Sequence, residues 1–427
     1  MNARSSTLVA LVAACLLPLA AAPGARADEG AASDGGDQAR RSLTTTGTNP
    51  RPMFAIWQEP GGDGFIKPVI ELGSLVVGYF PSSDQAEGLA SRVSTLALAR
   101  FGMEGRLFGL ITFRSVFERN LGFSLARNGP VGTSVWEGTG SFSARENYLR
   151  FDVGDFSITG GIIRDPASVD FVSVNILDAF GMDPYVRDPL LVSGFNQSQG
   201  LLLNYQAGPV TFGLAFTGGN PLTTSLAFGF GGDVTSLGTL FTAPLRALSN
   251  GVPGSDIQVM TFSPSVILAT DVVDVAVAGQ FYAIDVDATT DSDESINGFN
   301  ARMTARLKLL DRRFQFYLSG AYRKNQQLAV PDLTTRTDAY EGVVFGTGFD
   351  LSFDRVGAGA QYYYLHSELN SQSNLTNHYL NVGLTYWLEP PYASVGLRWA
   401  RTMAESEPTK PRLQSTDSII LSMRLML

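Results

Sequence analysis

Residues Gly298–Lys324 read GFNARMTARLKLLDRRFQFYLSGAYRK and decide the fold. From Phe299 to Leu309 every second residue is apolar, whereas the residues between them are polar and include three cations. After a turn at the polar pair Asp311-Arg312, the alternation resumes and continues to Leu318. Successive side chains of a β-strand point to opposite faces of the sheet. The stretch therefore predicts a β-hairpin with one apolar face and one polar, basic face.

The same two-residue alternation recurs along the chain. Turn residues separate the segments, helical heptads are missing, and the 45 glycines exceed the usual share of about 7%. These features predict an all-β protein with about 16 strands, most of them long enough for the roughly 9 to 11 residues of a membrane-crossing strand. The expected strands are 68–80, 91–103, 106–118, 145–153, 155–164, 199–207, 209–218, 256–269, 271–285, 297–309, 313–325, 339–353, 355–368, 377–388, 391–403 and 416–427.

The predicted connections alternate in length. Tight turns are expected at Glu104-Gly105, Gly154-Asp155, Gly208, Thr270, Asp311-Arg312, Asp354 and Glu389-Pro390, with long polar loops at 118–144, 164–198 and 217–255. Lipid offers the backbone no hydrogen bonds, so a sheet within it must close on itself. The pattern therefore predicts a transmembrane antiparallel up-and-down β-barrel over residues 65–427, with short periplasmic turns and long extracellular loops.

The beginning of the chain has the pattern of an export signal. Arg4 precedes the apolar run Leu8–Ala22, and Ala25-Arg26-Ala27 fits a small-x-small cleavage site. We expect residues 1–27 to be a cleaved signal peptide and residues 28–64 a flexible periplasmic segment. The sequence around Cys15 has an alternative interpretation as a lipoprotein box, but the apolar run continues past it.

Charge and composition exclude several classes of function. Without Arg4 and Arg26 the chain has 29 basic against 40 acidic residues, which argues against a nucleic-acid partner. No apolar run outside the signal is long enough for a spanning helix. His366 and His378, the 2 histidines, stand in no motif that pairs a histidine with a nucleophile. We expect no enzymatic activity, no cofactor and no metal site.

Some segments carry a family resemblance. The last strand alternates from Ser418 to Leu427 and resembles the C-terminal assembly signal of outer-membrane proteins, although that signal usually ends in an aromatic residue. The whole pattern resembles a bacterial outer-membrane porin. Segments 148–156, 198–200, 208–215 and 382–390 are loosely similar to the phosphate-selective (O and P type) porin family. The resemblance implies passive diffusion of ions and small polar solutes, a homotrimer, and a third long loop that narrows the pore.

The pore-lining and loop residues follow from the alternation and from this resemblance. The expected inward residues are Arg106, Arg150, Asp152, Arg302, Arg306, Lys308, Arg313, Arg398 and Arg424. Loop 164–198 is the candidate constriction, with Asp165, Asp170, Asp178, Asp183, Arg187 and Asp188. Rings of charge set ion preference, and a basic wall favours anions slightly. Lumen charges that pair with one another and only keep the channel wet are an equal alternative.

Two other functions fit the same pattern. A surface barrel with a blocked lumen is the first, because Thr217–Ser255 is rich in Gly, Leu and Phe, and exposed apolar loops mark contact sites. A secreted soluble β-sandwich is the second. For the porin we expect the bacterial outer membrane as location and outer-membrane lipid and lipopolysaccharide as partners.

Overall fold

The computed structural model describes the strands and short turns of the chain. The described ranges are 55–59, 64–81, 92–126, 135–136, 143–163, 165–169, 171, 198–219, 256–287, 294–325, 340–369, 373–389, 392–407 and 414–426. The predicted signal peptide 1–27, most of the segment 28–64 and most of the loops 164–198 and 217–255 lie outside these ranges.

Most of the described residues are in β-strands. The strands are β1 (Trp57–Gln58), β2 (Phe65–Pro81), β3 (Arg92–Leu107), β4 (Ile111–Ala126), β5 (Val135–Trp136), β6 (Ser143–Val153), β7 (Phe156–Ile163), β8 (Ser198–Ala207), β9 (Val210–Gly219), β10 (Asp256–Ala269), β11 (Val273–Asp287), β12 (Glu294–Leu309), β13 (Phe314–Asn325), β14 (Tyr340–Phe353), β15 (Val356–Leu369), β16 (Ser373–Glu389), β17 (Ala393–Glu407) and β18 (Gln414–Met426). A 3-10 turn, η2 (Pro166–Ser168), follows β7. The described residues form no helix long and apolar enough to cross a membrane.

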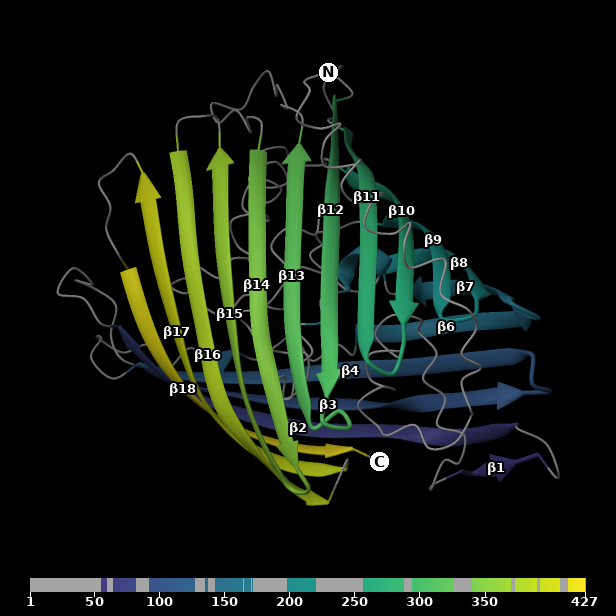
Figure 1. The fold of residues 1–427 in the computed structure, drawn as a ribbon, viewed down its shortest axis with the longest axis horizontal. Coiled ribbons are helices and arrows are strands. Elements are labelled where there is room, and N and C mark those ends of the chain that lie inside the picture. Colours follow the sequence, from purple (N-terminus) through teal and green to yellow (C-terminus); the bar gives the residue numbers. More distant parts are fainter. Residues whose placement is uncertain are drawn as a thin grey trace. The chain divides into compact units, whose positions relative to one another are not determined.

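The long strands form one closed ring. Each pairs antiparallel with its neighbour in sequence, and β18 pairs with β2, so that no long strand is left with an open edge. The two-residue strands β1 and β5 pair with β2 and β4 at the margin of the ring. The result is a closed 16-strand antiparallel β-barrel, as the sequence predicts. Figure 1 shows β12 to β16 running side by side along one wall.

The alternation of side chains sorts the barrel into two faces. On β12 the outward residues Phe299, Met303 and Leu307 are exposed, whereas the inward residues Arg302 and Arg306 are buried. The same alternation holds on β11, β13 and β14. Hydrocarbon side chains on the outside and polar ones on the inside are the arrangement of a membrane barrel.

Short turns close one end of the barrel. In the turn between β12 and β13, Leu310, Asp311 and Arg312 have φ values of 52°, 52° and 67°. The left-handed conformation of these three residues is costly for non-glycine side chains. An ion pair of 2.9 Å between Arg312 and Asp271 joins this turn to the neighbouring β10–β11 turn.

One predicted turn is wrong. β3 continues through Glu104-Gly105 and ends at Leu107, and the turn is Phe108–Leu110. Gly105 belongs inside the strand because a Cβ there would lie 2.6 Å from a ring carbon of Phe113. The glycine is required for close packing, not for a turn.

Candidate functional site

Charged side chains gather on the inner face of the barrel. Among the inward residues whose side chains the structure describes, basic side chains outnumber acidic ones. The acidic ones are Glu71, Glu104, Asp152, Asp274 and Asp350, and the basic ones are Lys67, Arg100, Arg106, Arg114, Arg150, Arg302, Arg306, Lys308, Arg323, Arg398 and Arg424. The described inner wall is therefore basic, although the whole chain has a net charge of −9.

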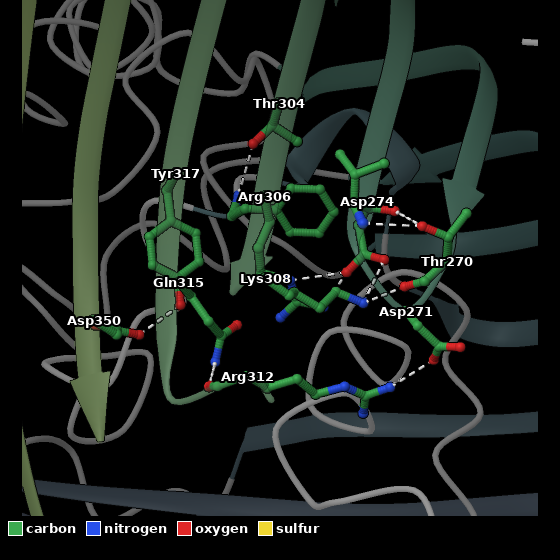
Figure 2. Close-up of polar contacts among 12 residues, drawn as sticks. Thr270, Asp271, Asp274, Thr304, Arg306, Lys308, Arg312, Gln315, Tyr317 and Asp350 are labelled. Carbon is green, nitrogen blue, oxygen red and sulfur yellow. Dashed lines mark hydrogen bonds and ion pairs between the residues drawn. The ribbon is translucent and has the colours of Figure 1, made fainter. Parts of the chain in front are cut away.

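Several of these charged residues form clusters, and the first cluster lies where β11 begins and β12 ends. Asp274 stands directly opposite Arg306 in the strand register. Its carboxylate accepts a hydrogen bond of 2.8 Å from Arg306 Nε and forms an ion pair of 2.8 Å with Lys308 Nζ (Figure 2). Lys308 Nζ also donates to the carbonyl of Thr270 at 2.6 Å. One buried acid is thus shared by two cations.

Two further clusters repeat this arrangement near the ends of β2 and β18. Glu71 contacts Arg100 at 2.7 Å and Arg424 at 3.1 Å. Glu104 contacts Lys67 at 2.8 Å and also pairs with Arg114. We call these three groups of one acid and two cations the triads: Asp274–Arg306–Lys308, Glu71–Arg100–Arg424 and Glu104–Lys67–Arg114.

A tyrosine continues the first triad onto the next strands. Tyr317 on β13 pairs in register with Arg306 and is almost fully buried. Its hydroxyl donates to Asp350 on β14 at 2.5 Å (Figure 2). Polar contacts therefore join β11 to β12 through Asp274 and β13 to β14 through Tyr317, and Arg306 and Tyr317 are register partners between the two pairs.

The chain that leaves β7 turns onto the inner wall. We call residues 165–169 and Phe171 the loop root. Asp165 caps η2 by accepting a 2.8 Å hydrogen bond from the Ala167 N–H. Its other oxygen accepts from Ser263 on β10 at 2.9 Å and from Gln280 on β11 at 2.7 Å. The carboxylate thus ties the loop root to two strands of the wall.

Phe171 provides a second attachment of the loop root. Its backbone N–H donates to Thr304 Oγ1 on β12 at 2.9 Å. The guanidinium carbon of Arg306 lies 5.2 Å from the centre of the Phe171 ring, within the range of a cation–π contact. Phe171 is 0% exposed. The first triad therefore also supports the loop root.

The ionisation of Asp165 is set by its burial. Desolvation raises the pKa of this carboxyl, and hydrogen bonds from Ala167, Gln280 and Ser263 partly offset the rise. The folded protein therefore keeps the proton to a higher pH than the unfolded chain, in which the pKa is near 3.8. The stabilisation from this group is complete below that value and is lost as the pH rises through the raised pKa.

Further along the wall, Tyr282 extends past Gly298 and contacts Arg323. Tyr282 on β11 stands opposite Gly298 on β12, and its hydroxyl accepts from Arg323 Nε on β13 at 3.0 Å. The Arg323 guanidinium carbon lies 5.3 Å from the Tyr282 ring centre. A Cβ on residue 298 would lie 2.4 Å from the hydroxyl of Tyr282. Glycine at 298 therefore lets the ring lie across β12.

We expect Gly298→Val to destabilise the barrel by about 1–3 kcal/mol, the usual cost of overpacking. The added side chain displaces Tyr282, so Arg323 loses both its hydrogen bond and its stacking partner. Denaturant unfolding of the refolded protein in lipid vesicles measures the effect. Gly320→Ala is the matched control, because no atom lies within 4 Å of the position its Cβ would take. Equal stability of both variants would contradict this role of Gly298.

The structure places most of the predicted wall residues on the inner face. Eight of the nine alternate inward on their strands, namely Arg106, Arg150, Asp152, Arg302, Arg306, Lys308, Arg398 and Arg424. Arg313 differs, because it is exposed and belongs to the turn Leu310–Arg313, not to β13. The three left-handed residues lengthen this turn, so the strand begins one residue later than predicted.

The predicted loop residues are described only in part. Asp165 lies on the wall, where Ser263, Gln280 and the Ala167 backbone donate hydrogen bonds to it. Asp170, Asp178, Asp183, Arg187 and Asp188 lie outside the described residues. Glu71, Glu104, Arg100, Lys67 and Arg114 were not predicted, because the alternation on the first two long strands is irregular, whereas Arg424, the second partner of Glu71, was predicted to face inward. Within the described ranges, no three His, Cys, Asp or Glu side chains are placed to hold a metal ion.

No family model and no curated protein matches this chain. Among solved structures, it resembles the outer-membrane channel DcaP of Acinetobacter baumannii, with 11% identity and a TM-score of 0.56 over 88% of this chain and 100% of that one. An anion-selective porin from Comamonas acidovorans matches with 10% identity and a TM-score of 0.55 over 85% and 100%. The trimer form of OmpT, an outer membrane protein of Vibrio cholerae, matches with 10% identity and a TM-score of 0.50 over 85% and 99%. This chain therefore has the barrel fold of outer-membrane porins.

Proposed function

We propose that this protein is an outer-membrane porin that forms a water-filled channel for ions and small polar solutes. The observation that carries the proposal is the closed 16-strand barrel with an apolar outer face and a charged inner wall. Barrels of 16 to 18 strands are wide enough to leave an aqueous channel. Flux through such a channel follows from its width and its wall charge, with no chemical step.

A slight preference for anions belongs to the same proposal. The excess of basic over acidic side chains among the described inward residues supports it, because rings of charge set ion preference. The name of the Comamonas acidovorans neighbour is consistent with it. Phosphate selectivity is not part of the proposal.

Location, assembly and the constriction complete the proposal. We propose insertion in the bacterial outer membrane after removal of residues 1–27, contact with lipid and lipopolysaccharide, and a homotrimer, for which the trimer form of the Vibrio cholerae protein is a precedent. We also propose that loop 164–198 narrows the lumen. The hydrogen bonds of Asp165 and Phe171 to the inner wall support this role.

A surface barrel with a blocked lumen is the second candidate function. The near-complete burial of inward polar residues such as Gln280 and Asn381, both 0% exposed, favours it. Liposome swelling separates the two candidates. If the protein is a porin, it should be found in the outer-membrane fraction and should migrate differently on gels before and after heating. Liposomes that contain it should then admit small sugars and exclude larger ones. Folded protein that admits no sugar would favour the blocked barrel.

A further inference from the structure

A row of uncharged residues crosses the inner wall on β7 to β10. In the strand register Ser157 stands opposite Asn204, Asn204 opposite Gly213, and Gly213 opposite Ser265. Thr159 lies two residues from Ser157 and therefore on the same face of β7. We call these residues the polar row. Adjacent strands are about 4.8 Å apart, so the polar row extends about 14 Å around the wall.

The polar atoms of this row are buried and form no hydrogen bonds with the protein. Ser157, Thr159 and Ser265 are 4%, 0% and 7% exposed. Within the described part of the chain, their three hydroxyl oxygens and Asn204 Nδ2 have no hydrogen-bond partner. A buried polar group that lacks a partner is costly. Water or a solute in the passage should therefore complete these hydrogen bonds.

Gly213 lets two of these polar side chains converge over β9. A Cβ at residue 213 would lie 2.4 Å from Ser265 Oγ and 3.1 Å from Asn204 Oδ1. The two side chains come from the strands on either side of the glycine. Amides and hydroxyls both donate and accept hydrogen bonds. The converging groups therefore match the hydroxyls of a sugar or polyol, which also donate and accept.

Apolar side chains border the polar row. Thr159 stands opposite Leu202, and Leu202 packs with Ile163 and Ala215. Binding sites for small molecules combine an apolar lining with a few placed polar groups. A sugar has both kinds of surface, because its hydroxyls lie at the edge of the ring and its C–H groups on the faces.

The polar row itself carries no charged side chain. Beyond its β7 end, Arg150 and Asp152 on β6 form an ion pair of 2.5 Å with each other. Beyond its β10 end, Ala278 on β11 separates Ser265 from Arg302 on β12. Amide and hydroxyl groups between these charges favour an uncharged solute over an ion.

The loop root lies next to the polar row. Ser265 is two residues from Ser263 on β10, and Ser263 donates a hydrogen bond to Asp165 of the loop root. The turn η2 also contacts β9 and β10. If loop 164–198 narrows the lumen, a passing solute comes close to the wall at this level.

We propose that the polar row is a weak binding site for uncharged, hydroxyl-rich solutes of the size of mono- and disaccharides. A solute hydroxyl replaces water on these groups with hydrogen bonds of similar strength. Binding is therefore weak, and the solute can leave again, as conduction requires. This inference rests on the proposed channel function and names a class of solute that the channel retains in passing.

Sucrose is the probe, and the ion current through single channels in a planar bilayer reports its binding. We expect sucrose to reduce the wild-type current along a saturable curve. Polyethylene glycol of the same size, which has few hydroxyls, should show no saturation. N204A/S265A removes two hydrogen-bonding groups, so the sucrose concentration for half of the maximal reduction should rise at least about fivefold. S157A/T159V tests the β7 end of the polar row and should also raise it.

Ser319→Ala is the matched control. Ser319 on β13 is also buried, and its Oγ has no hydrogen-bond partner among the described residues. Its register neighbours are Gly346 and Thr304, and the Thr304 hydroxyl already bonds to Phe171 and Leu318. We expect the wild-type half-saturation concentration. Heat-modifiable migration on gels confirms that each variant folds.

Three results would overturn the proposal. They are a wild-type current that sucrose does not reduce saturably, a half-saturation concentration unchanged in both double variants, and an equal rise in Ser319→Ala. Equal effects of sucrose and polyethylene glycol count as the first of these. A folded wild-type barrel that passes no current would instead contradict the channel function on which the proposal rests.

Discussion

Replacing Asp165 with alanine should turn a single steady current level into several interconverting levels. The variant removes the acceptor for Ala167 N–H, Ser263 and Gln280 at once. Leaving buried donors without an acceptor costs about 1–3 kcal/mol each, so the loop root should leave the wall in a substantial fraction of molecules. Single-channel recording in planar bilayers should show a distribution of open-state amplitudes at least about twice as wide as that of the wild type.

Asp165→Asn is the matched control for this prediction. The amide has the shape of the protonated carboxyl but keeps only one of the two acceptor oxygens, so we expect a distribution of open-state amplitudes wider than that of the wild type and narrower than that of Asp165→Ala. Asp165→Asn also removes the group that titrates. As the pH rises through the raised pKa of Asp165, the loop root should therefore loosen in the wild type but not in Asp165→Asn. A single narrow level in Asp165→Ala would show that the contacts of Asp165 do not hold the loop root.

Replacing Asp274 with alanine should have the largest effect on stability. The variant leaves Arg306 and Lys308, which are 5% and 8% exposed, without the carboxylate between them. Removing one partner of a buried ion pair costs about 3–5 kcal/mol. The attachment of Phe171 to the wall should weaken as well, because Arg306 contacts its ring. Urea unfolding of the barrel in lipid vesicles measures the loss.

Lys308→Gln provides the comparison for Asp274→Ala. It keeps the Asp274–Arg306 pair and a side chain that can still donate to the Thr270 carbonyl, so we expect a loss of about 1 kcal/mol, close to that of one hydrogen bond. If the two variants lose the same stability, Asp274 is not the centre of the cluster. If neither loses stability, water reaches these groups freely, and the burial argument fails.

The fold could be predicted from the sequence because the bilayer imposes a simple rule. Each strand must place apolar side chains outward, so the two-residue alternation at Gly298–Lys324 gives the facing of β12 and β13 directly. The predicted span 256–269 agrees with β10, and most other boundaries agree within a few residues. The Glu104-Gly105 turn failed because a glycine inside a strand looks like a turn signal when only the sequence is read.

The candidate site could be predicted only in part. Alternation shows that Arg306 and Arg424 face inward, but it does not show which acid lies beside each. Glu71 and Arg424 are far apart in sequence and meet only because β18 closes the ring on β2. The contacts of Asp165 with Ser263 and Gln280 likewise depend on the path of the chain after β7, which alternation does not determine.

Single-channel recording of the purified, heat-modifiable protein in a planar lipid bilayer tests the central claim most directly. If the inner wall lines a water-filled passage, folded protein should produce discrete, uniform steps of current whose size grows with salt concentration. A folded barrel that inserts into the bilayer and yields no current steps would contradict this account.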